Sequence, residues 1–90
     1  MILSSQIKSQ LKAKAHSLKP VVWIGDKGLS ESVMAEINLA LTAHELIKIK
    51  ISGQDKDVQA QTISQIIEQT GAGLVQTIGH IATVYKAKNK

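Results

Sequence analysis

The sequence of 90 residues contains no cysteine, no arginine and no phenylalanine. The absence of cysteine excludes disulfides, thiolate metal sites and a cysteine nucleophile. No apolar run approaches the roughly 18 residues that a membrane-spanning helix needs. Residues 1–10 also lack the apolar segment of a signal peptide. We therefore expect a cytoplasmic protein with no membrane partner.

Aromatic residues are scarce, with one tryptophan, Trp23, and one tyrosine, Tyr85. RNA-binding sheets that stack bases on several aromatic side chains are therefore excluded. Trp23 is expected to pack in the core, and a stacking role is the alternative. Without arginine the chain lacks the side chain best suited to bidentate contacts with guanine or phosphate. Any contact with nucleic acid should thus depend on its backbone and shape.

The remaining composition is that of one ordered domain over residues 1–90, with 43% hydrophobic and 20% charged residues. All eleven basic residues are lysines, and they outnumber seven acidic residues to give a net charge of +4. A small basic domain suggests an anionic partner, most often a nucleic acid. We expect a monomer.

Periodicity and boundary residues predict seven elements in the order α-β-α-β-α-β-β. Strands that alternate with helices indicate right-handed crossovers, which can leave both crossover helices on one side of the sheet and the other face open. We therefore predict an α/β two-layer sandwich. The predicted elements are a helix that begins at Ser4 or Ser5 and ends before Pro20, a strand over 21–24, a helix capped by Ser30, a strand over 46–52, a helix capped by Asp57 and ended by Gly71, and strands over 74–78 and 81–85 joined at Gly79-His80.

Lysines recur on two of the predicted elements. Lys8, Lys12 and His16 form a stripe along the first helix, which Lys19 joins if the helix extends that far. Lys48 and Lys50 alternate with the isoleucines of the strand over 46–52, which predicts a basic outward face. These lysines either form a binding surface or are the solvated side of amphipathic elements.

The sequence Gly25-Asp26-Lys27-Gly28 lies between a predicted strand and a helix. Flanking glycines allow close approach of a ligand, and the unpaired N–H groups of a helix N-terminus favour phosphate. The KH domain clamps nucleic-acid backbone with such a GxxG loop. Lys27 supports phosphate binding, whereas the carboxylate of Asp26 opposes it. The alternative is a turn that contains glycine for geometric reasons only.

The sequence offers little for catalysis or metal binding. Its three histidines, His16, His44 and His80, fall on three different predicted elements, so no metal site is expected. His44 fits the end of a helix, where a cation is favourable. No nucleophile elbow is present. We therefore expect a protein that is not an enzyme and uses no cofactor.

Residues 11–51 (LKAKAHSLKPVVWIGDKGLSESVMAEINLALTAHELIKIKI) and 70–86 (TGAGLVQTIGHIATVYK) resemble the YhbY-type bacterial form of the CRM domain. The most specific segments are HELIKIKI, residues 44–51, and the closing IGHIATVYK. Gly25 and Gly28 match the family's GxxG motif. One departure is Lys86 after Tyr85, where the family often has arginine.

The resemblance implies a four-stranded mixed sheet similar to the C-terminal domain of bacterial translation initiation factor three. It also implies RNA binding, with large-subunit ribosomal RNA in pre-ribosomal particles as the partner and a role in ribosome assembly. The alternatives are a module that docks on a ribosomal protein and an architectural DNA-binding protein. An enzyme acting on an anionic small molecule is the weakest hypothesis. The predicted RNA-binding residues are Gly25, Asp26, Lys27, Gly28, Lys12, Lys19, Lys48, Lys50 and Lys86.

Overall fold

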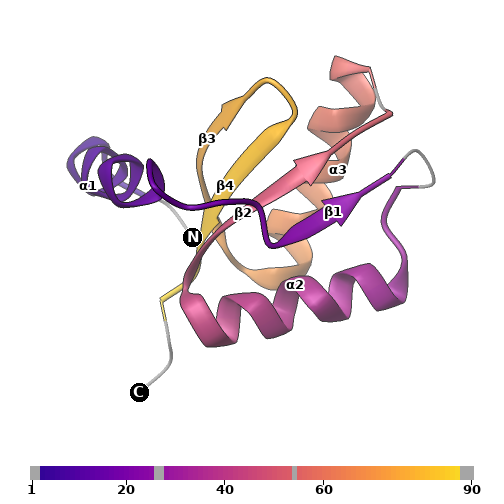
Figure 1. The fold of residues 1–90 in the computed structure, drawn as a ribbon, viewed down its shortest axis with the longest axis horizontal. Coiled ribbons are helices and arrows are strands. Elements are labelled where there is room, and N and C mark those ends of the chain that lie inside the picture. The colour runs from indigo at the N-terminus through magenta and orange to yellow at the C-terminus, as the bar shows by residue number, and fades with distance from the viewer. Residues whose placement is uncertain (1–2, 26–27, 54, 88–90) are drawn as a thin grey trace.

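The computed structural model describes residues 3–25, 28–53 and 55–87. They form the predicted element order (Figure 1). None of the helices in these ranges is long and apolar enough to span a membrane. The elements are α1 (Ser5–Ala15), β1 (Val22–Ile24), α2 (Glu31–His44), β2 (Leu46–Ile51), α3 (Lys56–Thr70), β3 (Gly73–Ile78) and β4 (Ile81–Tyr85).

The four strands form one mixed sheet in the order β1-β2-β4-β3. The β1 strand is parallel to β2, while β4 is antiparallel to both β2 and β3. The C-terminal end of β1, which leads into the GxxG sequence, therefore lies at the same end of the sheet as Ile51 and Ile81. The sandwich with a four-stranded mixed sheet that the sequence predicted is confirmed.

One face of the sheet carries the core. Ile47, Ile49 and Ile51 of β2 are almost completely buried, as the alternation with lysine predicts. The two flanking strands add apolar residues to the same face, because Ile49 pairs with Val22 on one side and Ala82 on the other. Both α2 and α3 cover this face and contribute the buried residues Ile37, Leu41, Ile63 and Ile66.

The opposite face, called the second face below, is covered in part by α1. Thr83 alternates with the core residues Ala82 and Val84, so its side chain points to the second face, yet it is only 1% exposed. Leu11 and Ala15 of α1 are also buried, and α1 contacts β2 and β3. In Figure 1, α1 lies on one side of the strands and α2 on the other. The second face is therefore less open than the sequence suggested.

Two helix boundaries differ from the sequence prediction. Asp55, not Asp57, caps α3, because its Oδ1 accepts a hydrogen bond from the Val58 N–H at 2.9 Å. Asp57 lies in the first turn, where a negative charge is also favourable. The α1 helix ends at Ala15, so Lys19 does not extend its lysine stripe but lies in the segment that leads to β1. The predicted Ser30 cap, the helix end at His44 and the Gly71 stop are confirmed.

Candidate nucleic-acid interface

The GxxG sequence connects the end of β1 to the start of α2. The Gly28 N–H donates a hydrogen bond to the Gly25 carbonyl at 3.0 Å, which closes a four-residue turn. Gly28 has a φ of 77°, in the left-handed region that residues other than glycine rarely adopt. Gly25 has no positive φ, and a Cβ built there meets no atom within 4 Å. Asp26 and Lys27 lie outside the described residues.

The N-terminus of α2 follows the turn directly. The Ser30 hydroxyl accepts a hydrogen bond from the Val33 N–H at 3.2 Å and caps the helix. Other N–H groups of the first turn lack a partner within the helix and give this end a partial positive charge. Glu31 in the same turn opposes that charge. The helix end is thus suited to an anion only in combination with other positive groups.

Lys48 and Lys50 both point to the second face, as predicted, but they differ in their surroundings. The Lys48 Nζ donates a hydrogen bond to the Leu18 carbonyl at 3.1 Å, and its side chain is half-buried. Lys48 thus holds the segment after α1 against β2. Lys50 is exposed and pairs with Trp23 of β1. Of the two, Lys50 is the lysine better placed to contact a ligand.

Trp23 does not pack in the core, and the sequence expectation for it was wrong. Its side chain is 61% exposed on the second face. The reason is alternation: Val22 and Ile24 are buried against α2, which turns the residue between them away from the core. The exposed indole lies two residues before Gly25, beside Lys50.

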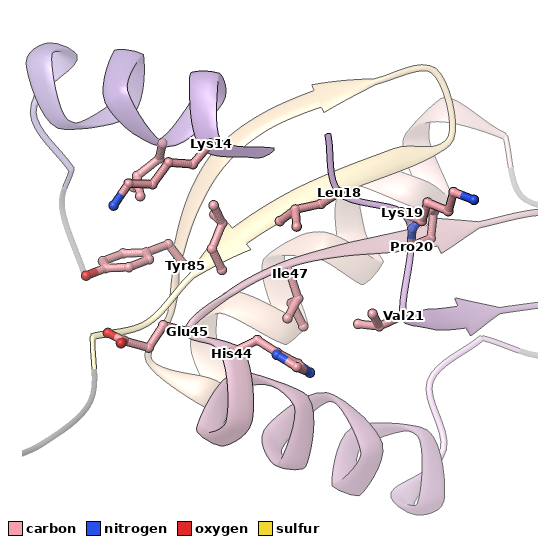
Figure 2. Close-up of a pocket in the computed structure, with 11 residues that line it drawn as sticks. Lys14, Leu18, Lys19, Pro20, Val21, His44, Glu45, Ile47 and Tyr85 are labelled. Atoms are coloured by element: carbon pink, nitrogen blue, oxygen red, sulfur yellow. The ribbon is translucent and has the colours of Figure 1, made fainter. Parts of the chain in front are cut away.

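A hollow of about 560 Å³ lies between α1, residues 18–21 and the turn from α2 into β2. Lys14 and Lys19 lie at opposite ends of this hollow, with Leu18 and Ile47 between them (Figure 2). The lysines do not converge on one point, and Glu45 also lines the hollow, which is therefore an apolar depression with groups of both charges around it. Lys14 was not among the predicted binding residues, because it lies two positions after Lys12 on α1 and therefore off the stripe of Lys8 and Lys12.

The remaining predicted lysines are widely spaced. Lys12 is exposed on α1. Lys86 follows β4 at the far end of the sheet from the GxxG turn, because its N–H donates to the Glu45 carbonyl next to the start of β2. The structure therefore brings Lys50 and Trp23 together near the turn and places Lys86 away from them.

Most acidic and basic residues lie on different sides of the sheet, and the exception is Glu45, which lines the hollow together with Lys14 and Lys19. Asp26 is not described, and each of the other six acidic residues belongs to α2, α3 or a residue that caps them. That side has one described lysine, Lys56. By contrast, α1, the segment after it and the outward positions of β2 carry six lysines and, within the described residues, no acidic residue. These lysines are Lys8, Lys12, Lys14, Lys19, Lys48 and Lys50.

This arrangement is suited to binding an extended polyanion. Lysines spread along one side can contact several phosphates by charge. Within residues 3–25, 28–53 and 55–87, no three histidine or acidic side chains are grouped closely enough to hold a metal ion. The geometry thus defines an α/β domain with a glycine-bracketed turn at the edge of a lysine-bearing sheet face.

Comparison with known proteins agrees with this class. The family model of the CRS1/YhbY (CRM) domain matches residues 3–86. The chain therefore belongs to the CRS1/YhbY (CRM) domain family, and the resemblance seen in the sequence is confirmed.

Similar proteins match over most of their length. A Haemophilus influenzae protein named "RNA-binding protein" is 49% identical over 84 residues, which cover 93% of this chain and 85% of that protein. The Pseudomonas aeruginosa protein PA4753, also named for RNA binding, is 39% identical over 100% of this chain and 86% of its own length. The solution structure of a hypothetical Staphylococcus aureus protein superposes with a TM-score of 0.86, at 28% identity, covering 99% and 93% of the two chains.

Proposed function

We propose that this protein is an RNA-binding protein that assists assembly of the large ribosomal subunit by binding its precursors. It acts in the cytoplasm as a monomer and catalyses no reaction. The names of the similar H. influenzae and P. aeruginosa proteins support RNA as the partner. The resemblance to the bacterial CRM domain supports large-subunit ribosomal RNA, with ribosomal proteins as further contacts.

The observation that carries the proposal is the division of charge across the sheet. A net charge of +4 is modest, but the acidic residues of α2 and α3 are separated from the lysines of α1 and β2. The positive side therefore presents a stronger potential than the net charge suggests, and it attracts phosphates.

In the proposed mechanism the GxxG turn and the N-terminus of α2 contact the RNA backbone. Gly25 and Gly28 allow close approach, and Lys27 adds a positive charge, which the carboxylate of Asp26 opposes. The predicted lysines Lys12, Lys19, Lys48 and Lys50 then extend the contact over the second face, and Lys86 contacts RNA that reaches the far end of the sheet. Recognition is of folded RNA shape, because no arginine is available to read bases.

The proposal predicts different effects for two substitutions that change the net charge equally. Lys50→Glu is expected to weaken binding of a structured RNA by about tenfold, because it reverses a charge on the lysine-bearing side. Lys56→Glu is expected to change affinity by less than about threefold, since Lys56 belongs to α3, which covers the other face of the sheet. Fluorescence anisotropy with a labelled RNA hairpin measures both dissociation constants.

Equal losses of RNA affinity in the two variants would show that net charge alone drives binding and would contradict binding on the second face.

Duplex DNA of the same length is the competitor in this assay. Preference for the duplex DNA would favour the DNA-binding alternative and overturn RNA as the partner.

The role of the GxxG turn is tested by a pair of alanine substitutions. Gly25→Ala is expected to weaken RNA binding without lowering the free energy of unfolding, because its Cβ enters open space that the RNA backbone would occupy. Gly28→Ala is expected to lower the free energy of unfolding by about 1–2 kcal/mol, because alanine is strained at positive φ. Urea denaturation followed by circular dichroism measures stability, and anisotropy measures affinity. Unchanged affinity in Gly25→Ala would remove the turn from the interface.

The assignment to large-subunit precursors needs a test in cells. Crosslinking the protein to RNA and sequencing the attached fragments is expected to recover large-subunit ribosomal RNA. Recovery of other RNAs alone would contradict the assembly role while leaving RNA binding in place.

A further inference from the structure

Four residues form a row across the second face at the end of the sheet next to the GxxG turn. Strand pairing places Trp23 beside Lys50, Lys50 beside Ile81, and Ile81 beside Ile78. We call these residues the Trp23 row. Neighbouring strands lie about 4.8 Å apart, so the row extends about 14 Å. Trp23 is 61% exposed and Ile78 is 65% exposed, so α1 does not cover this end of the second face.

The exposed Trp23 side chain is a candidate contact for a binding partner. A tryptophan that is buried contributes a large apolar area to a core or an interface, and this one contributes little of its area to the core. The indole is flat and accessible, and Lys50 beside it has an exposed side chain. An aromatic surface next to a cation is the combination that binds an unpaired nucleotide, with the base on the ring and the phosphate near the ammonium group.

The surrounding charge favours a nucleotide over an apolar protein partner. None of the four strands carries a carboxylate, and Lys48 lies one position further along the same face of β2. Trp23 also lies two residues before Gly25, so a strand held at the GxxG turn would place its next nucleotides over the row. An apolar protein partner would have no need of the positive charge of Lys50.

We propose that the Trp23 row binds an unpaired nucleotide of RNA, whose base stacks on the Trp23 indole and whose phosphate lies next to Lys50. This inference rests on the proposed RNA binding and adds a requirement to it: the bound RNA has a single-stranded element beside the part held at the GxxG turn. Recognition is then of unpaired bases in general, because stacking is tolerant of base identity.

The protein carries its own probe, because Trp23 is its only tryptophan. Two RNAs with the same number of nucleotides are titrated into the intact protein, one a hairpin with a loop of unpaired uridines and the other a continuous duplex. Stacking of a base on the indole is expected to quench the Trp23 fluorescence with the hairpin and to leave it nearly unchanged with the duplex. Equal fluorescence at saturation with both RNAs would overturn the inference.

Three variants separate stacking from general apolar contact. Trp23→Ala is expected to weaken binding of the looped hairpin by about 5- to 100-fold, as for the loss of one stacked base. Trp23→Phe is expected to retain most of the affinity, because a ring remains. Leu39→Ala removes another exposed apolar side chain, 73% exposed on α2, and is expected to leave affinity unchanged.

The results distinguish this inference from the proposed function. Failure of the wild-type protein to bind either RNA would overturn both. Binding that keeps its dependence on Lys50 but is not weakened by Trp23→Ala would overturn stacking alone. An equal loss for hairpin and duplex in Trp23→Ala would also overturn it, because a duplex offers no unpaired base. Since Trp23 is exposed, circular dichroism is expected to show an unchanged denaturation midpoint for the variant.

Discussion

Raising the salt concentration from about 50 to about 200 mM is expected to weaken binding to RNA by about 20- to 130-fold. The range follows from about three to five phosphate contacts, each contributing roughly −0.7 to the slope of log K against log salt. The six lysines on α1, the segment after it and β2, together with the GxxG turn, can supply this number of phosphate contacts. Dissociation constants measured by anisotropy at several salt concentrations determine the slope.

The variant Lys50→Glu provides the control for this measurement. Loss of one phosphate contact is expected to make the slope shallower by about 0.7, whereas Lys56→Glu should leave the slope at its wild-type value. A slope near zero for the wild-type protein would contradict electrostatic binding and would favour a protein partner on the second face.

The largest expected effect on stability comes from Ile49→Ala, which should lower the free energy of unfolding by about 2–5 kcal/mol. Ile49 is fully buried in the middle of β2 and pairs with Val22 and Ala82. The shorter alanine side chain leaves a cavity there. The neighbouring strands and the helices above Ile49 have little freedom to move in and fill it. Domains of this kind have total stabilities of about 5–15 kcal/mol, so the loss is a large fraction of the whole.

Leu39→Ala is the matched control for stability, because it also shortens an aliphatic side chain but at an exposed position of α2. It is expected to change the free energy of unfolding by less than about 0.5 kcal/mol. Circular dichroism is the suitable readout, since Trp23 is already exposed and its fluorescence should change little on unfolding. Similar losses for Ile49→Ala and Leu39→Ala would contradict the described core.

Local patterns predicted most of the fold. The alternation of isoleucine and lysine in β2 defined both its core face and its outward face, and both assignments are confirmed. Ser30 and Gly71 marked the ends of helices because capping depends on neighbouring backbone atoms. The prediction of Asp57 as the cap of α3 was wrong: Asp55, two residues earlier, accepts the hydrogen bond from the Val58 N–H, and the sequence pattern did not locate the helix start to within two residues.

The candidate site was less predictable. Trp23 was expected in the core because large aromatic residues are usually buried. Its strand has only three residues, too few for alternation to be recognised in the sequence. Whether Trp23 is exposed also depends on how much of the second face α1 covers. The α1 helix is distant in the sequence from β2 and β3, the strands that it contacts. The hydrogen bond of Lys48 to Leu18 was equally hidden, since it joins residues 30 positions apart.

The sequence by itself determined the element order, the core face of the sheet, the lysine-only basic character and the glycine turn, because these depend on composition and on residues close together along the chain. Only the tertiary structure decided that α1 lies opposite α2 and α3, that most acidic residues lie on the other side of the sheet from most lysines, and that Trp23 is exposed beside Lys50. These features depend on which elements cover which face, and packing between distant segments sets that arrangement.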